Sequence, residues 1–222
     1  QETLKKIVPI ARMEDLIYER TGARPGTFGQ WFVLNPKVDD IPEKCSVKVD
    51  GIWLLVMGGV ARGGGGCVCP ENTVLKTLLN HLVLERGDVV ILDMEAGLEH
   101  LGRGTARAVD AFLVVVEPGR RSFQTAADVI RLARDLGVGK VFGVANKVGP
   151  DEIPMTRAQA EAIGLELLGW IPHDPSLVLA DAQGRPAWEA SDVVVRAAEE
   201  IRKRLLDRIP VQKPDASMSP VR

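Results

Sequence analysis

Short runs of consecutive apolar residues alternate along the chain with segments in which apolar residues recur every three or four positions. Runs of the first kind predict strands covered on both faces, at residues 52–57, 89–92, 112–116, 141–145 and 165–171. Helical spacing is found at residues 1–22, 70–86, 122–136, 156–163 and 191–208. Another strand is expected at 31–34. This alternation predicts an α/β fold, a three-layer mostly parallel sheet with helices on both faces.

Polar residues and glycines at the ends of these segments predict where helices begin and end. Ser122 is expected to cap one helix, which Gly137 then ends. Thr156 and Gln159 fit a capping box for the next helix. We expect one domain over residues 1–208, followed by a polar, proline-containing tail at 209–222 that is disordered.

Composition and charge exclude several classes of protein. The 222 residues carry a formal net charge of -2, without the basic excess of a nucleic-acid-binding protein. No apolar run approaches the ~18 residues of a membrane helix, and the first residues lack the apolar region of a secretory signal. Three cysteines are an odd number and do not form a disulfide framework. A cytoplasmic protein with reduced thiols, bound to neither nucleic acid nor membrane, is expected.

Four of the predicted strands end at residues that could contact a ligand. They are Asp93, Glu117, Asn146 and Pro172. Ligands of parallel sheets bind beyond the carboxyl ends of the strands. Asp93, with Gly97 four residues later, suits a nucleotide–magnesium site. The carboxylate can hold a metal-bound water, and the glycine lets a backbone N–H approach a phosphate. The alternative is an aspartate that merely starts a turn.

The pair Asn146-Lys147 suits the recognition of a base. An asparagine amide can donate to and accept from a purine edge, and a lysine stem can cover the ring. The segment Pro172-His173-Asp174 would flank the same base, and His173 is given no catalytic role. The alternative is a polar turn after a strand.

Cys67 and Cys69 form a C-x-C motif between four glycines and a predicted helix. In extended backbone the two side chains face the same side, so both thiols can bind one metal ion. The helix N-terminus favours the thiolate form. A closed thiolate site usually takes four ligands, which two copies across a dimer axis would supply. The alternative is a pair of small cysteines in a turn.

The glycines at 63–66 are not a phosphate-binding loop. They do not lead into Gly-Lys-Ser/Thr, and G-x-x-x-x-G-K-[ST] is found nowhere in the 222 residues. Nor does a G-x-G-x-x-G follow a strand.

Together these motifs resemble a known family. The strings GGGGCVCPEN, DMEAGLEHLGRGTARAVD, VVEPGRRS and NKV are similar to those of CooC-type accessory ATPases. These proteins form part of the MinD/ParA branch of P-loop NTPases and serve nickel insertion into carbon monoxide dehydrogenase. The similarity extends to about Leu206.

The resemblance implies an ATP hydrolase that binds ATP or ADP with Mg²⁺. Asp93, as catalytic residue, Glu95 and Gly97 would lie near the γ-phosphate and magnesium. Asn146, Lys147 and the segment 172–174, including His173 and Asp174, would hold adenine. Cys67 and Cys69 would bind Ni²⁺ or Zn²⁺ at the interface of a homodimer, and carbon monoxide dehydrogenase would be the client.

One departure from the family is large. The N-terminal phosphate loop, with its helix and following strand, is not present, a difference of roughly forty to fifty residues. Because residue 1 is Gln, we expect a fragment that cannot hydrolyse ATP by itself. Two alternatives stay open, a MinD/ParA-type positioning ATPase and a non-enzymatic metal-binding dimer.

Overall fold

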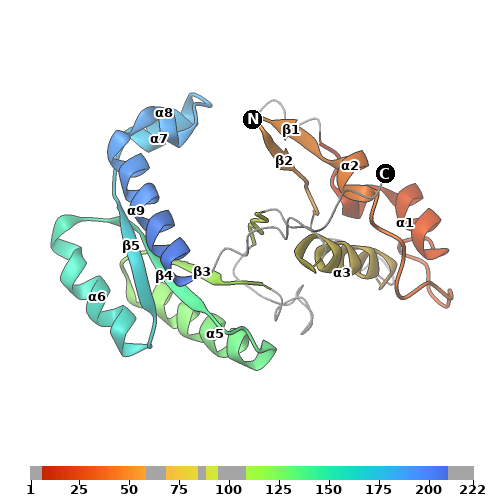
Figure 1. Ribbon diagram of the computed structural model, residues 1–222, viewed down its shortest axis with the longest axis horizontal. Helices are drawn as coiled ribbons and strands as arrows, with labels where there is room; N and C mark the ends of the chain where they lie inside the picture. The colour runs from red at the N-terminus through yellow and green to blue at the C-terminus, as the bar shows by residue number, and fades with distance from the viewer. Residues whose placement is uncertain (1–6, 59–68, 85–88, 95–108, 210–222) are drawn as a thin grey trace, which may run out of the picture. The chain divides into compact units, whose positions relative to one another are not determined.

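The computed structural model describes residues 7–58, 69–84, 89–94 and 109–209. The chain divides into two compact units, residues 1–92 with 99–108 and residues 93–98 with 109–222. Figure 1 shows the helices and strands of each unit. None of the described helices combines the length and apolarity needed to cross a lipid bilayer.

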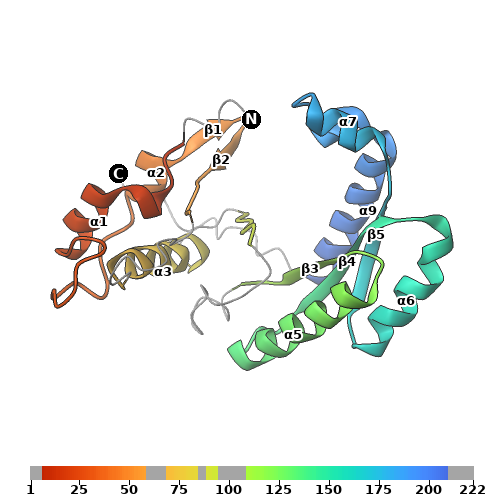
Figure 2. The same cartoon turned by 180° about the vertical axis from the view of Figure 1, so that it is seen from behind.

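Within the described residues, the second unit contains a parallel sheet in the order β3-β4-β5. Its strands are β3 (Phe112–Val116), β4 (Val141–Val148) and β5 (Glu166–Pro172). They are linked through α5 (Arg120–Leu136), the short helix η3 (Pro150–Glu152) and α6 (Ile153–Ala162). The chain then forms α7 (Ser176–Ala182), α8 (Ala187–Ala190) and α9 (Asp192–Arg208). Figures 1 and 2 show α5 and α6 on one face of this sheet and α9 on the other, so the α/β fold is confirmed.

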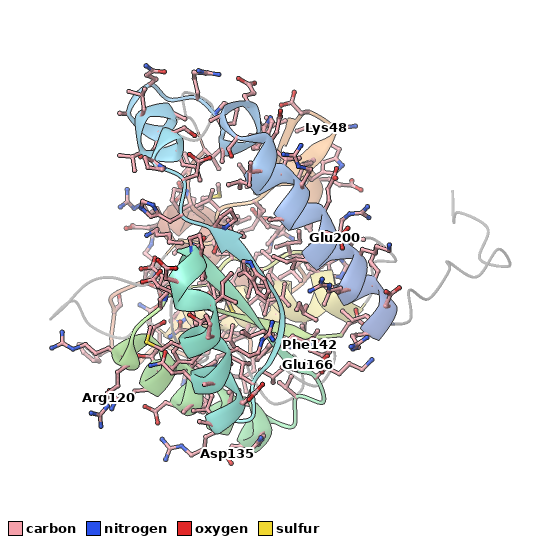
Figure 3. All side chains as sticks on the ribbon, turned by 90° about the vertical axis from the view of Figure 1, so that its left-hand side faces the viewer. Lys48, Arg120, Asp135, Phe142, Glu166 and Glu200 are labelled. Atoms are coloured by element: carbon pink, nitrogen blue, oxygen red, sulfur yellow. The ribbon has the colours of Figure 1, made fainter. Side chains whose placement is uncertain are left out.

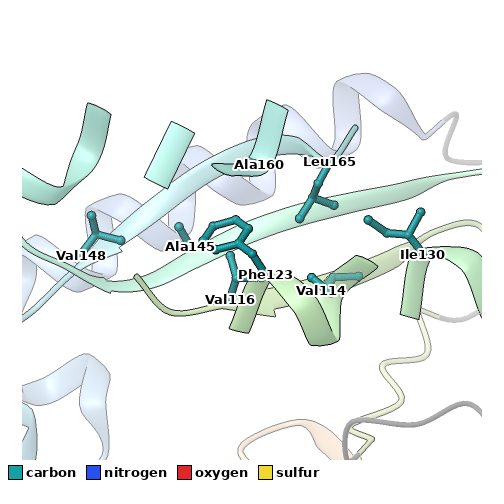
Figure 4. Close-up of a cluster of buried hydrophobic side chains, with 9 residues drawn as sticks. Val114, Val116, Phe123, Ile130, Ala145, Val148, Ala160 and Leu165 are labelled. Carbon is teal, nitrogen blue, oxygen red and sulfur yellow. The ribbon is translucent and has the colours of Figure 1, made fainter. Parts of the chain in front are cut away.

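The two faces of the sheet bury separate apolar clusters, because successive residues of a strand point to opposite sides. One cluster joins β3 and β4 to the inward side of α5 (Figure 4), and includes Val114, Val116, Phe123, Ile130 and Ala145. On the opposite face, Phe142, Val144 and Leu168 meet Ile201 of α9. Charged side chains such as Arg120, Asp135 and Glu200 point outward in Figure 3.

Helix α9 lies very close to β5. A Cβ on Gly169 would stand 2.8 Å from Cγ1 of Ile201. The pairing of β4 with β5 shifts between Gly143 and Val144, and next to this shift Arg204 donates from Nη1 to the Leu168 carbonyl at 2.8 Å. At the end of α9, Arg208 pairs with Glu166 at 3.0 Å, and Lys140 donates to the Arg208 carbonyl at 2.7 Å.

The first unit is built around α3 (Cys69–Leu84). It also contains η2 (Ile10–Arg12), α1 (Glu14–Thr21), α2 (Ile41–Cys45), β1 (Val47–Val49) and β2 (Ile52–Leu54). The apolar side of α3, with Val74 and Leu78, packs against Ile10, Ile17 and Ile41. Helix α1 ends at Gly22, whose left-handed conformation provides the predicted stop.

Three predicted strands differ from the structure. Residues 31–34 are irregular, and Trp31 is 97% exposed. Of residues 52–57 only Ile52–Leu54 forms a strand, in an antiparallel hairpin with β1 that leaves Ile52 70% exposed. No described strand pairs with residues 89–92, where Val89 is 90% exposed. An apolar run becomes a buried strand only where neighbouring strands satisfy its backbone. In the described chain residues 31–34 and 89–92 pair with no strand, and residues 52–54 pair on one side only, with β1.

Several helix starts also differ from the prediction. Of residues 1–22, predicted to be helical, the described part forms the short helix η2 and then α1 from Glu14. Helix α5 begins at Arg120 after Gly119, so Ser122 lies inside the helix and does not cap it. Helix α6 begins at Ile153, three residues before Thr156, so the predicted capping box is wrong. The carboxylate of Glu152 instead accepts from the Gly149 N–H at 2.7 Å. The predicted tail lies outside the described residues from 210 onward.

Candidate functional site

The carboxyl ends of β3, β4 and β5 form one edge of the second unit. Glu117 follows β3 directly, and Val148 at the end of β4 lies opposite Pro172 at the end of β5. The His173 N–H donates to the Val148 carbonyl at 3.2 Å. The structure thus brings Asn146, Lys147 and the segment 172–174 to the same edge, as the sequence predicted.

The end of β4 is irregular where two of these residues lie. The sequence placed Asn146 and Lys147 after the strand, whereas β4 continues to Val148. The pairing with β5 shifts between Ala145 and Val148, and Lys147 has a φ of 55°. The side chain of Asn146 is half-buried and makes no hydrogen bond within the described part of the chain. An amide without a protein partner can still donate to and accept from the polar edge of a ligand.

Glu117 joins the ends of β3 and β4. Its carboxylate oxygen Oε1 lies 2.6 Å from Nζ of Lys147. Its backbone N–H donates to Oγ of Ser122 at 3.0 Å, which explains the position of Ser122 inside α5. The sequence predicts Glu117 at a strand end without indicating a specific binding role for it. An acidic residue after one strand and a lysine at the end of its neighbour were the signal that could have indicated this pair.

Asp174 holds together the segments that follow β5. Its Oδ1 accepts from the Ser176 N–H at 2.9 Å, next to the start of α7. Hydrogen bonds from the Ser191 and Ser176 side chains lower the pKa of Asp174. Ser191 is buried and also accepts from the Val194 N–H, as the cap of α9. The carboxylate of Asp174 therefore holds the start of α7, while the neighbouring His173 is exposed.

Asp93 is not at the end of a strand in the structure. It is exposed and belongs to no helix or strand, because no strand in the described part of the chain pairs with the preceding residues. Glu95 and Gly97 lie outside the described residues. A role of these three residues near a phosphate stays a prediction.

The C-x-C motif precedes the main helix of the first unit. Cys69 is the first residue of α3, one residue before the predicted start, and Cys67 lies outside the described residues. Among the residues that the structure describes, no three His, Cys, Asp or Glu side chains gather as a metal site would require. The metal-binding role of Cys67 and Cys69 stays a prediction.

Comparison with known proteins assigns the chain to a family. No family model matches. The chain is 44% identical over 209 residues to the carbon monoxide dehydrogenase accessory protein CooC of Rhodospirillum rubrum, a match that covers 94% of the chain and 78% of that protein. The chain belongs to the CooC family of ATPases.

Two further proteins are similar to the chain. An uncharacterized ATP-binding protein of Methanocaldococcus jannaschii is 44% identical over 200 residues, which cover 90% of the chain and 76% of that protein. The cell division ATPase MinD of Pyrococcus furiosus superposes with a TM-score of 0.51 at 16% identity, covering 79% of the chain and 77% of its own. The second likeness shows a MinD-like fold.

The described residues of this CooC-family chain fit the base end of a nucleotide. The unpaired amide of Asn146 supplies a donor and an acceptor, and the stem of Lys147 and the ring of Pro172 supply apolar surface at the same edge. Phosphate groups would need backbone N–H groups or cations as partners. The carboxylate of Asp174 already accepts from the Ser176 N–H, so it is less available to a ligand.

Proposed function

We propose that this protein serves the maturation of carbon monoxide dehydrogenase as an ATP-dependent metallochaperone that assists nickel insertion. The observation that carries the proposal is the 44% identity to the Rhodospirillum rubrum accessory protein over 94% of the chain. Carbon monoxide dehydrogenase is the proposed client, and ATP or ADP with Mg²⁺ are the proposed cofactors. The proposed place of action is the cytoplasm.

The strand ends of the second unit are the proposed site for the adenine. Bound ATP with Mg²⁺ supplies the free energy of phosphoanhydride hydrolysis. Asn146 donates to and accepts from the base edge, and the stem of Lys147 covers the ring. Pro172 and His173 form the wall of the site on the side of β5. Asp174 holds their segment in place by accepting from the Ser176 N–H. Asp93, Glu95 and Gly97 are proposed to lie at the phosphate end.

The cargo is proposed to bind at Cys67 and Cys69. Each copy of the chain supplies two thiolates, and a tetrahedral site for Ni²⁺ or Zn²⁺ takes four, so two copies share one ion. Metal binding and dimer formation are then linked, since each favours the other. Cys45 is left out of the site because burial raises the pKa of its thiol and it packs against the core of the first unit.

A metal titration tests this proposal. Wild-type protein is titrated with Ni²⁺ and with Zn²⁺ under reducing conditions, and bound metal and molar mass are measured. We expect one ion per two chains and a dimer. The variant Cys67→Ser/Cys69→Ser should lose both, whereas the matched control Cys45→Ser should keep both. Unchanged stoichiometry in the double variant would sink the metallochaperone proposal.

The same samples separate the alternatives when ADP binding is measured beside metal binding. ADP binding without metal binding would favour a positioning ATPase of the MinD/ParA type. Metal binding without ADP binding would favour a non-enzymatic metal-binding dimer. Binding of both, with metal-dependent association with apo carbon monoxide dehydrogenase, is the result that we expect.

A further inference from the structure

We propose that Glu117 is a positioning residue for the nucleotide base, because it holds the side chain of Lys147 across the ends of β3 and β4. The inference rests on the proposed function, in which this edge binds adenine. Glu117 itself need not touch the ligand. Its effect passes through Lys147, the residue after Asn146, whose amide makes no hydrogen bond within the described part of the chain.

The position of Glu117 is determined by its backbone. It follows β3 directly, and its N–H donates to Oγ of Ser122 in the first turn of α5 at 3.0 Å. The residue is therefore attached both to the sheet and to the helix that covers it. From this fixed base the carboxylate reaches Lys147 on the neighbouring strand, with 2.6 Å between Oε1 and Nζ. The pair thus joins two adjacent strands at the edge where the ligand is proposed to bind.

The backbone of Lys147 has an unusual conformation. Among the described residues, Lys147 and Asp50 are the non-glycine residues with positive φ, at 55° and 48°. Asp50 lies in the hairpin turn between β1 and β2, where such a conformation is ordinary. Lys147 lies instead inside the pairing shift of β4, where L residues seldom adopt this conformation. Uncommon backbone geometry of this kind occurs often at binding sites.

The ion pair has little value for stability, which points to another role. The side chains of Lys147 and Glu117 are 61% and 52% exposed. Pairs exposed to this extent contribute little to folding because water screens them. A lysine held in one conformer before binding, however, loses less side-chain entropy when a ligand arrives. The pair is therefore suited to preparing the Lys147 stem as a surface for the base.

The test compares two variants that each remove one exposed ion pair. Glu117→Gln removes the charge opposite Lys147. Glu166→Gln is the matched control, because Glu166 pairs with Arg208 at 3.0 Å, both side chains are 52% exposed, and the pair lies at the opposite end of β5. The dissociation constant of Mg-ADP is measured by calorimetry. We expect Glu117→Gln to weaken binding about three- to tenfold, from the rotamer freedom returned to the lysine, and Glu166→Gln to bind like wild type.

A double-mutant cycle separates positioning from a general structural effect. Lys147→Met keeps an apolar stem but cannot pair with Glu117. If Glu117 acts through Lys147, adding Glu117→Gln to Lys147→Met should weaken ADP binding no further. Melting temperatures of both single Glu variants should stay within about 4 °C of wild type.

Three results would overturn the inference, and they differ in what they mean. Equal ADP affinity of Glu117→Gln and wild type would remove the positioning role but leave the proposed function intact. Additive losses in the cycle would show that Glu117 acts independently of Lys147. No ADP binding by wild-type protein would overturn the proposed function and the inference together.

Discussion

Arg204 of α9 donates from Nη1 to the carbonyl of Leu168 in β5 at 2.8 Å. Leu168 lies where the pairing of β4 with β5 shifts, because Gly143 is opposite Leu167 while Val144 is opposite Gly169. Leu168 is thus the extra residue of β5 at this point, outside the regular ladder. The guanidinium of a surface helix takes the place of the missing strand partner.

Replacing Arg204 should therefore destabilise the second unit. The variant Arg204→Met keeps most of the aliphatic stem but leaves the Leu168 carbonyl without its donor. A hydrogen bond to a charged group contributes ~1.5–3 kcal/mol, and we expect a loss in this range or below it because the contact is only partly buried. Urea unfolding measures it. Arg202→Met, on an exposed position of the same helix, is the control, and equal losses in the two variants would show that the bond to Leu168 is unimportant.

The close approach of α9 to β5 predicts a cost for any side chain at Gly169. In Gly169→Ala the new Cβ would lie 2.8 Å from Cγ1 of Ile201, a distance that forces the helix or the strand to move. Such overpacking costs ~1–3 kcal/mol. Gly139→Ala is the matched control, since nothing lies within 4 Å of its Cβ position.

A second substitution tests whether Ile201 is the cause. Ile201→Ala removes the clashing atom, so the double variant should be more stable than the sum of the two single losses predicts. The free energies of unfolding of all four proteins complete the cycle. Strict additivity would place the strain of Gly169→Ala elsewhere.

The ion pairs of Asp40 predict a pH dependence in the first unit. The hydrogen bond from Lys44, at 2.7 Å, together with that from Arg20 at 2.8 Å, lowers the pKa of Asp40 from 3.8 to about 2. Because the pKa is lower in the folded state, its contribution to stability is present above pH 3.8 and disappears as the pH falls through about 2. In Asp40→Asn this part of the acid destabilisation should be absent.

Thermal melts between pH 2 and pH 5 measure the effect. Asp39→Asn is the control, because Asp39 is exposed and its partner Lys37 is 3.6 Å away. It should lose stability with falling pH as wild type does. A wild-type curve parallel to that of Asp40→Asn would contradict the assignment.

Ser191 links a helix cap to a carboxylate, so one substitution should change two measurable quantities. In Ser191→Ala the Val194 N–H loses its acceptor, and the loss of a cap of this kind costs ~0.5–2 kcal/mol. Because the Ser191 hydroxyl is the main cause of the lowered pKa of Asp174, that pKa should rise toward its ordinary value. Carbon-13 NMR titration measures the pKa and urea unfolding the stability. Ser191→Thr keeps the hydroxyl and should preserve both, and an unchanged pKa in Ser191→Ala would contradict the link.

The sheet of the second unit could be predicted because its strands are bounded by strong local signals. The apolar run 112–116 ends at Glu117-Pro118-Gly119, and Gly137 and Gly164 end the helices that precede β4 and β5. The residues that end the predicted parallel strands then indicated which positions share an edge. Asn146 and Pro172 were found in this way.

The errors arose where structure depends on neighbours that a local pattern does not reveal. Residues 89–92 are as apolar as β3, but no described strand lies beside them. The hairpin of β1 and β2 was missed although Asp50-Gly51, a typical two-residue turn, marks it between Val49 and Ile52. The prediction that Ser122 caps α5 was wrong for a similar reason. Its hydroxyl accepts from the backbone N–H of Glu117, five residues earlier in the chain.

Helix α9 is attached to the sheet along its whole length. Ser191 and Asp174 hold its beginning, Arg204 and Ile201 its middle, and the pair of Arg208 with Glu166 its end. A helix held to its sheet by few contacts would open on its own and exchange its amide hydrogens quickly. The last turn of α9 makes only an exposed ion pair with the first residue of β5, whereas the turns before it are held by the Arg204 hydrogen bond to Leu168 and by the packing of Ile201. The amide hydrogens of these earlier turns should therefore exchange at the slow rate of the strands beneath them, and those of the last turn should exchange faster.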